Sequence, residues 1–378
     1  MPLSAARPGD SVQVRGGPLH FTFWPMHRTT RRYGLQVGLY TANPLGLIRD
    51  CIYSDCPATS RAEALAYLSQ AEYLYRSATD SAEWAAKPLL LYYSFMNLAK
   101  AYVVTRSVRA TLDRPRHGLT DRLHAGGVEI VDAYLESFAS TGGDINVFAD
   151  FLEALTGTGL PGNAVYDLPP LMAQLVTGHR LWGNATGNTD RFVNVQDILI
   201  MRSAQERKIW LVLQVYRSNL TRYGYTHTRL LNESGLSPAF REVASVTDPA
   251  TSETLLQFEQ AAPLAYTGRP SDKVPDLVRS LKQSLWAAVT SVPPHRQYYL
   301  YMVPPAERAM VLPQLCSVYA VTFYLGSVTR YRPQQFDRIL AGAYGGQVQE
   351  FLSTQPTQFL YLLASEFARR DVMRPDIV

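Results

Sequence analysis

The sequence predicts a mixed α+β protein dominated by helices, in which N- and C-terminal helices pack around an antiparallel sheet in the middle of the chain. Three observations support this fold class. Residues 87–104 form an almost wholly apolar run of helical length, and residues 306–331 form a second one. Between them, residues 191–201 and 208–216 are rich in alternating and β-branched apolar side chains, which is typical of paired strands.

The first 59 residues have the composition of an irregular segment. They contain many Pro, Gly and Thr residues, and residues 19–24 and 33–40 are short β-prone pieces. We therefore predict an irregular arm or small hairpin over residues 1–59, followed by an α+β body over residues 60–378.

The positive charge of the chain is concentrated in this arm. The formal net charge is +4, and five arginines minus one aspartate within the first 48 residues already give four: Arg7, Arg15, Arg28, Arg31 and Arg32 against Asp10. A basic segment interleaved with aromatic side chains can contact nucleic-acid phosphates, and Arg28, Arg31 and Arg32 are the candidate contacts. In the alternative interpretation, the aromatic side chains dock the arm onto the body.

Two helices are expected after the arm. Apolar residues within 60–76 share one side of a helical projection. The second helix begins near Pro88, which suits a first helical turn because its missing N–H would be unpaired there anyway. It is apolar around most of its circumference, with one thin polar line: Ser94, Asn97, Lys100 and Thr105. We expect this helix to be buried, with its polar line at a position where a charge is costly.

A loop is predicted over residues 111–127 because it holds Pro115 and several glycines. Gly118 indicates either a backbone conformation closed to other residues or a close approach by another segment. His117 would then be fixed in space. It either orders the loop by bonding a backbone carbonyl, or it serves a ligand or a reaction.

The rest of the chain continues the mixed pattern. Helical spacing recurs over residues 145–155, 169–176, 217–231 and 272–292. Strands are expected over residues 127–133 and 296–303, with a second hairpin from 240–246 and 254–258. The long C-terminal helix over 306–331 is expected to kink at Pro313 and to end before Pro333. Shorter helices follow over residues 336–340, 348–352 and 358–367.

Several function classes lack their usual sequence signals. Three cysteines make neither a disulfide framework nor a paired zinc spacing, so a reducing compartment is expected. The N-terminus lacks the apolar core of a signal peptide, and no uninterrupted apolar run reaches 18 residues, so we predict a cytoplasmic protein without a membrane partner. Four residues of types that can bind a metal lie close together in the sequence: Asp113, His117, Asp121 and His124. In a loop their spacing does not place them on one face, so no metal is expected. No cofactor is expected either, because phosphate-loop and dinucleotide motifs are missing from the sequence.

Two blocks of the sequence resemble a known family. Pro88 to Ser94, then Asn97 to Ala101, then the His117-Gly118 pair resemble the core signature of the bacterial YaaC-like protein family. The block from Val318 to Pro333, with its Arg-Tyr pair and proline, resembles the second conserved part of that family; this chain has Phe336 where the family tends to have Trp. The resemblance covers roughly residues 60–370 and implies a bacterial cytoplasmic protein, but it implies no particular activity.

The residues favour a binding function. If the two apolar helices pack side by side, Asn97, Lys100, His117 and Arg330 converge on one basic site, with Arg116 beside it, and this site would suit an anionic ligand. The partner could also be nucleic acid, a protein, a larger assembly or a second copy of the chain. In one alternative the protein is a hydrolase or nuclease, for example an antiphage effector, that uses His117 with a nearby Arg or Lys as its catalytic residues. In another it is a scaffold without a small ligand, in which Lys100 serves folding.

Overall fold

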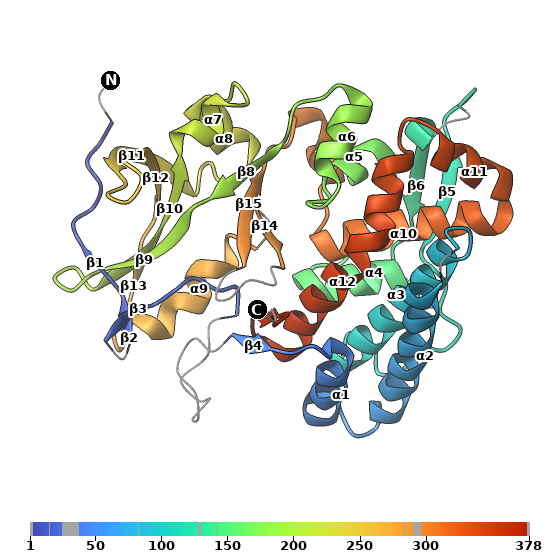
Figure 1. The fold of residues 1–378 in the computed structure, drawn as a ribbon. Coiled ribbons are helices and arrows are strands. Elements are labelled where there is room, and N and C mark those ends of the chain that lie inside the picture. The colour runs from blue at the N-terminus through green and yellow to red at the C-terminus, as the bar shows by residue number, and fades with distance from the viewer. Residues whose placement is uncertain are drawn as a thin grey trace. The chain divides into compact units, whose positions relative to one another are not determined.

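The computed structural model describes residues 3–14, 16–24, 38–81, 83–127, 130–141, 143–282, 284–289 and 296–375. The predicted mixed α+β fold with dominant helices is confirmed (Figure 1). The chain divides into two compact units made of interleaved segments: Met1–Thr41, Thr189–Arg308 and Arg369–Val378 form the first, and Ala42–Asn188 with Ala309–Ala368 form the second. The predicted division at residue 60 stays a prediction.

The first unit is built on an antiparallel sheet from the middle of the chain. Its strand order is β1-β9-β10-β12-β11, with β13 also paired to β10: β1 Asp10–Ser11, β9 Asp197–Ser203, β10 Lys208–Tyr216, β12 Thr254–Gln260, β11 Phe240–Thr247 and β13 Leu264–Ala265. Both predicted hairpins are present, and in the first of them Trp210 pairs with Met201. A second sheet has the order β14-β15-β8: β14 Leu285–Ala288, β15 Gln297–Tyr301 and β8 Phe192–Val195.

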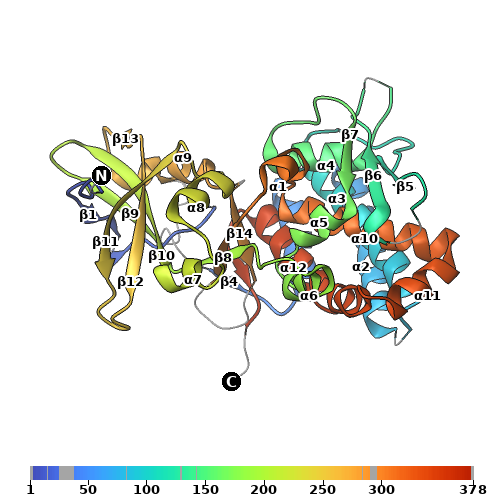
Figure 2. The ribbon, with the colours of Figure 1, turned by 90° about the horizontal axis from the view of Figure 1, so that it is seen from above.

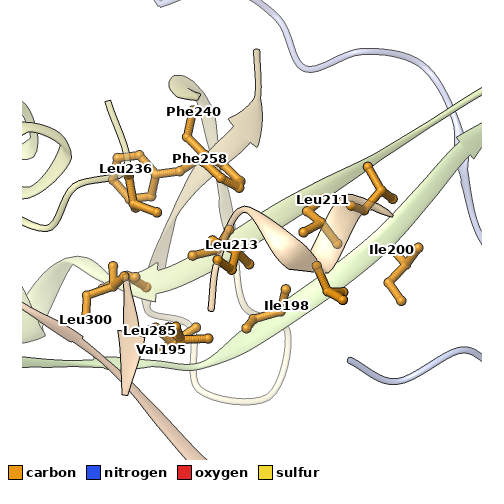
Figure 3. Close-up of a cluster of buried hydrophobic side chains, with 14 of the residues drawn as sticks. Val195, Ile198, Ile200, Leu211, Leu213, Leu236, Phe240, Phe258, Leu285 and Leu300 are labelled. Carbon is orange, nitrogen blue, oxygen red and sulfur yellow. The ribbon is translucent and has the colours of Figure 1, made fainter. Parts of the chain in front are cut away.

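Apolar side chains of both sheets share one core with short helices of the same unit (Figure 3). These helices are α7 Arg217–Thr221, α8 His227–Glu233 and α9 Val274–Arg279, and the 3-10 helix η2 Pro270–Lys273 leads directly into α9. Two sequence predictions were wrong here. The helix expected over 217–231 is broken into α7 and α8, with Gly224 between them at a positive φ of 68°. The helix expected over 272–292 ends at Arg279, because Leu285–Ala288 pairs with β15 as a strand instead.

The described part of the N-terminal arm up to Thr41 belongs to the first unit, and the rest of it to the second. Short strands form a small hairpin, β2 Gln13–Val14 with β3 Gly17–Pro18, which lies before the β-prone pieces 19–24 and 33–40. The rings of Phe21 and Phe23 meet the ring of Tyr298 edge-on, with centroids 5.4 and 5.8 Å apart. Farther along, β4 Leu39–Tyr40 pairs in parallel with β16 Val372–Met373. These contacts agree with the interpretation in which aromatic side chains dock the arm.

The second unit contains the long helices. Its elements are α1 Pro44–Asp55, α2 Arg61–Asp80, α3 Lys87–Thr105, α4 Val147–Thr156, α5 Leu168–Ala173, α6 His179–Thr186, α10 Gln314–Tyr331, α11 Pro333–Ala341 and α12 Gly345–Ala368. A small sheet joins them, with β5 Leu119–Leu123, β6 Ala133–Ser137 and β7 Ala164–Asp167 side by side (Figure 2). The N- and C-terminal helices pack together as predicted: the rings of Phe95 on α3 and Phe359 on α12 stack with centroids 4.0 Å apart.

The packing of α3 against α10 depends on a glycine. Gly326 on α10 faces α3, where an added Cβ would lie 3.0 Å from Tyr92 Cβ and 3.3 Å from the carbonyl oxygen of Pro88. The ring of Tyr92 also meets that of Phe323 edge-on, with centroids 5.2 Å apart. The missing side chain at position 326 therefore allows the two helices to approach closely at Tyr92.

Several boundaries in the second unit differ from the predictions. Helix α1 lies in the segment expected to be irregular. Strand β5 lies inside the expected loop 111–127, and the strand expected over 127–133 begins only at Ala133, after the 3-10 helix η1 Ile130–Asp132. Residues 305–310 form the 3-10 helix η3 Pro305–Met310, in which the chain passes from the first unit to the second, and α10 starts after Pro313 instead of kinking there.

Helix α12 continues through Pro356, where two separate helices were predicted. Phe351 and Phe359, on either side of the proline, are buried at 2% and 0% exposure. Interior proline costs a helix about 3 kcal/mol, and burying two such aromatic side chains contributes on the order of 4 kcal/mol. The free energy gained by burying these side chains therefore exceeds the cost of the proline inside the helix.

We predict that Gly326→Val lowers the free energy of unfolding by about 1–3 kcal/mol, because a side chain there overpacks the contact between α3 and α10. Urea denaturation followed by circular dichroism measures this. The matched control is Gly346→Val in α12, where nothing lies within 4 Å of an added Cβ. An equal effect of both substitutions would contradict the close approach.

Candidate functional site

His117 is held in place by the backbone of the loop that carries it. The N–H of Val147 donates to the carbonyl oxygen of Arg116 at 3.0 Å, and the N–H of Phe148 donates to that of His117 at 3.3 Å. Gly118 has a φ of +81°, and a Cβ there would lie 3.1 Å from the backbone nitrogen of Phe148. Both properties expected of this glycine are thus present, and they fix the loop against the start of α4.

The imidazole of His117 is oriented by Tyr92 of α3. The Tyr92 hydroxyl and Nδ1 of His117 form a hydrogen bond. Tyr92 is only 4% exposed, and burial raises the pKa of its hydroxyl well above the ordinary value, so this group stays protonated. A ring nitrogen is a better acceptor than the other two partners of this hydroxyl, which are the Met96 thioether at 3.6 Å and the hydroxyl of Tyr319. Tyr92 therefore donates to Nδ1, and the proton of the neutral ring is on Nε2.

Two cationic side chains act on His117 from the two signature helices. The pKa of His117 lies below its ordinary value, first because of burial and then because of the charges of Lys100 and Arg330. The side chain still reaches the surface. Lys100 of α3 and Arg330 of α10 therefore each act electrostatically on His117 of the loop.

Lys100 is half-buried and lacks a compensating carboxylate. Its Nζ lies over the ring of Tyr67 on α2, 5.3 Å from the ring centroid. Burial lowers the pKa of Lys100. Within the described ranges, no carboxylate oxygen lies within 4.0 Å of Nζ. A cation–π contact is weaker than an ion pair, so this ammonium group keeps much of its capacity to bind an anion.

Arg330 is exposed and makes contacts with two tyrosines. Its Nη1 donates to the hydroxyl oxygen of Tyr93 at 2.6 Å, and its guanidinium carbon lies 4.9 Å from the ring centroid of Tyr331. Among the residues that the structure describes, it too has no ion pair with a carboxylate. Because Tyr93 accepts this bond, the proton of its own hydroxyl remains available to donate.

We call Lys100, His117, Arg330 and Tyr93 the donor cluster. Lysine and arginine side chains only donate hydrogen bonds, and the neutral ring of His117 donates through Nε2. The Tyr93 hydroxyl is the fourth donor. A group made of acceptors alone, such as a phosphate or carboxylate, is the chemical complement of such a cluster.

The other two sequence candidates have different partners. Asn97 is 5% exposed, and its amide donates to Gln70 Oε1 of α2 at 3.4 Å. Arg116 forms an ion pair with Asp144, with Nη2 and Oδ1 3.1 Å apart. Of the five candidate residues, Lys100 and Arg330 act electrostatically on His117, Asn97 lies in α3 one turn before Lys100, and Arg116 pairs with Asp144.

The metal-competent residues of the loop are also bonded to separate partners. Asp121 pairs with Arg332, the residue between α10 and α11, and His124 Nε2 lies 3.0 Å from Asp167. In the described part of the chain, no three His, Cys, Asp or Glu side chains are grouped as metal ligands. The candidate nucleic-acid contacts of the arm, Arg28, Arg31 and Arg32, lie outside the described residues.

The tyrosines of the site were missed in the sequence. Tyr93 lies on the same helical line as Asn97 and Lys100, at spacings of four and seven residues, and this line could have indicated it. Tyr331 directly follows Arg330 in the second signature block. The sequence does not single out Tyr92, because its hydroxyl takes part in the site only by bonding His117, which lies in a different segment of the chain.

The fold and the cluster define a mixed α+β protein with a cationic, hydrogen-bond-donating surface site. The chain belongs to the YaaC-like protein family, whose model matches residues 52–367. No curated protein and no solved structure matches the chain. A search of the described helices for one long and apolar enough to cross a membrane finds none.

We predict that Gly118→Ala destabilises the protein by about 2–4 kcal/mol, because it combines a left-handed backbone conformation with a steric conflict. Gly126→Ala is the matched control: φ is +78° there, but nothing lies within 4 Å of an added Cβ. The control should cost only about 1–2 kcal/mol, for backbone strain alone. Urea denaturation gives both values.

The same substitution should displace His117. We expect its pKa, followed by NMR titration of the imidazole, to move up toward the ordinary value in Gly118→Ala and to stay unchanged in Gly126→Ala. Equal stability losses, or an unchanged pKa of His117 in Gly118→Ala, would contradict the fixed position of this loop.

Proposed function

We propose that this protein acts by binding an anionic ligand at the donor cluster. The observation that carries the proposal is electrostatic: Lys100 and Arg330 lack carboxylate partners in the described residues, and after burial it is the charges of these two residues that lower the pKa of His117. An isolated cation on a surface needs no explanation. Two cations that both act on the charge of one histidine are different, because an anion placed near them relieves the repulsion that the charged ring would meet.

Burial supports the same proposal. A lysine that serves only to cover apolar surface extends its ammonium group into water. Lys100 instead holds its ammonium group over Tyr67, at a depth that lowers its pKa. A partly desolvated cation binds an anion more strongly than a fully hydrated one, because less water has to be removed on binding.

The tautomer of His117 gives less support to the alternative, a hydrolase or nuclease, than to anion binding. A general base needs an unprotonated ring nitrogen facing the substrate. With Tyr92 donating to Nδ1, the exposed ring presents the N–H of Nε2, which donates a hydrogen bond and accepts no proton. This arrangement suits anion binding better than proton abstraction.

The wider expectations remain predictions of the sequence. A cytoplasmic location, membership of a larger assembly, self-association and an antiphage role are compatible with an anion-binding protein. Contact between nucleic acid and Arg28, Arg31 and Arg32 also stays a prediction of the sequence, because these residues lie outside those that the structure describes.

We predict that Lys100→Gln and Arg330→Gln each weaken the binding of tripolyphosphate at least about tenfold, because a charge-assisted hydrogen bond contributes about 1.5–3 kcal/mol. Isothermal titration calorimetry at low salt measures this. Arg116→Gln is the matched control. Arg116 neighbours His117 in the sequence but pairs with Asp144, so the variant should bind tripolyphosphate with an affinity within about twofold of that of the wild type.

Other outcomes would favour the alternatives. The scaffold interpretation predicts that tripolyphosphate does not bind and that Lys100→Ala lowers stability. The hydrolase interpretation predicts turnover of RNA, single-stranded DNA or nucleotides that disappears in His117→Ala. We expect neither the wild type nor His117→Ala to turn over any of them.

Binding should also depend on pH. In the free protein the pKa of His117 lies below 6.5, and a bound anion raises it because it favours the charged ring. Between these two values the complex holds one proton more than the free protein, so affinity increases as pH falls, by up to about tenfold per unit. Affinity should thus rise from pH 8 to pH 5.5.

The control for this experiment is His117→Gln, which keeps a donor but cannot titrate. The ratio of wild-type to variant affinity at each pH cancels the titration of the ligand itself. A ratio that stays constant across the range would show that His117 takes up no proton on binding.

A further inference from the structure

We propose that the ligand of the donor cluster is a phosphorylated nucleoside whose base stacks on Tyr331. The inference rests on the proposed function and adds the class of ligand to it. A donor cluster alone recognises only the anionic part of a ligand. Tyr331 adds an aromatic surface next to that cluster, in the residue that directly follows Arg330 at the end of α10.

Tyr331 is a large aromatic side chain that the fold leaves in solvent. It is 67% exposed, whereas Tyr324 and Tyr319 of the same helix are fully buried. Its ring contacts the guanidinium of Arg330 at 4.9 Å. That contact holds the ring beside the cation, and an exposed ring so placed can stack a base.

The position of Tyr331 joins the aromatic surface to the anion site. The ring of Tyr93, whose hydroxyl takes the bond from Arg330, lies 6.4 Å from the ring of His117, centroid to centroid. Arg330, itself a member of the donor cluster, thus contacts both Tyr93 of that cluster and the ring of Tyr331.

This combination suits a nucleotide better than a simple anion. A nucleoside phosphate carries acceptor oxygens at one end and a flat aromatic base at the other. Inorganic phosphate or a small carboxylic acid would leave the ring of Tyr331 without a role. The ligand could be a free nucleotide or the phosphorylated end of a single strand, which share this chemistry.

The test compares ATP, tripolyphosphate and a 5′-phosphorylated RNA tetramer on the full chain by calorimetry. Tripolyphosphate has a similar negative charge to ATP but no base, so a preference for ATP isolates the contribution of the base. We expect ATP or the tetramer to bind about five- to a hundredfold more tightly than tripolyphosphate, which is the range for stacking one base. Tighter binding of the tetramer than of ATP would identify a strand end as the source.

Substitutions of Tyr331 complete the test. Tyr331→Leu should remove the preference over tripolyphosphate and leave tripolyphosphate affinity within about twofold, and Tyr331→Phe should restore the preference. Tyr73→Leu is the matched control, because Tyr73 is an equally exposed tyrosine on α2, at 73%. It should change nothing.

Two results would overturn the inference. If tripolyphosphate binds as tightly as ATP and the tetramer, or if the preference survives in Tyr331→Leu, the anion site stands but the base does not stack on Tyr331. If none of the three ligands binds, the proposed function itself fails.

Discussion

The contact between Tyr92 and helix α10 is the constraint on which the site depends. Gly326 lets α10 approach the Cβ of Tyr92 and the backbone carbonyl of Pro88, and Phe323 packs on the ring of Tyr92. The same tyrosine bonds His117 through its hydroxyl. A single buried side chain therefore joins the core of the second unit to the position of the histidine, so the geometry of the cluster follows from helix packing.

The treatment of charge at the cluster differs from that in the rest of the chain. Where carboxylates are fully buried, the fold pairs them: Glu259 has Arg241 at 2.9 Å, and Asp150 has Arg109 at 2.9 Å. Such pairing avoids the large cost of a lone buried charge. Lys100 is partly buried and has no carboxylate partner in the described residues, and its charge contributes to the lowered pKa of His117. A partly buried charge without a partner in the described residues costs stability, and such charges are typical of sites that bind a ligand.

The sequence predicted those features that depend on local patterning. The polar line of α3 is visible in its apolar surroundings, the need for glycine at position 118 follows from its place in the loop, and the strand pair around β10 alternates clearly. The sequence could not predict features that depend on distant partners. Leu285 to Ala288 has helical spacing but meets β15, and Pro356 sits within one helix because its neighbours are buried. The interleaving of the two units was equally hidden, because periodicity does not tell which distant segments pack together.

The donor cluster has a charge that can adjust to its ligand. With His117 neutral the cluster carries the charges of Lys100 and Arg330, and protonation of the ring adds a third. A dianionic group is matched by the two fixed cations together with the neutral donor, and a more highly charged one would be matched after proton uptake. Because Tyr92 bonds to Nδ1 in the neutral ring and can accept from Nδ1–H in the charged one, the ring keeps its orientation in both states. The hydroxyl of a tyrosine suits this position better than a carboxylate, which would favour the charged ring permanently.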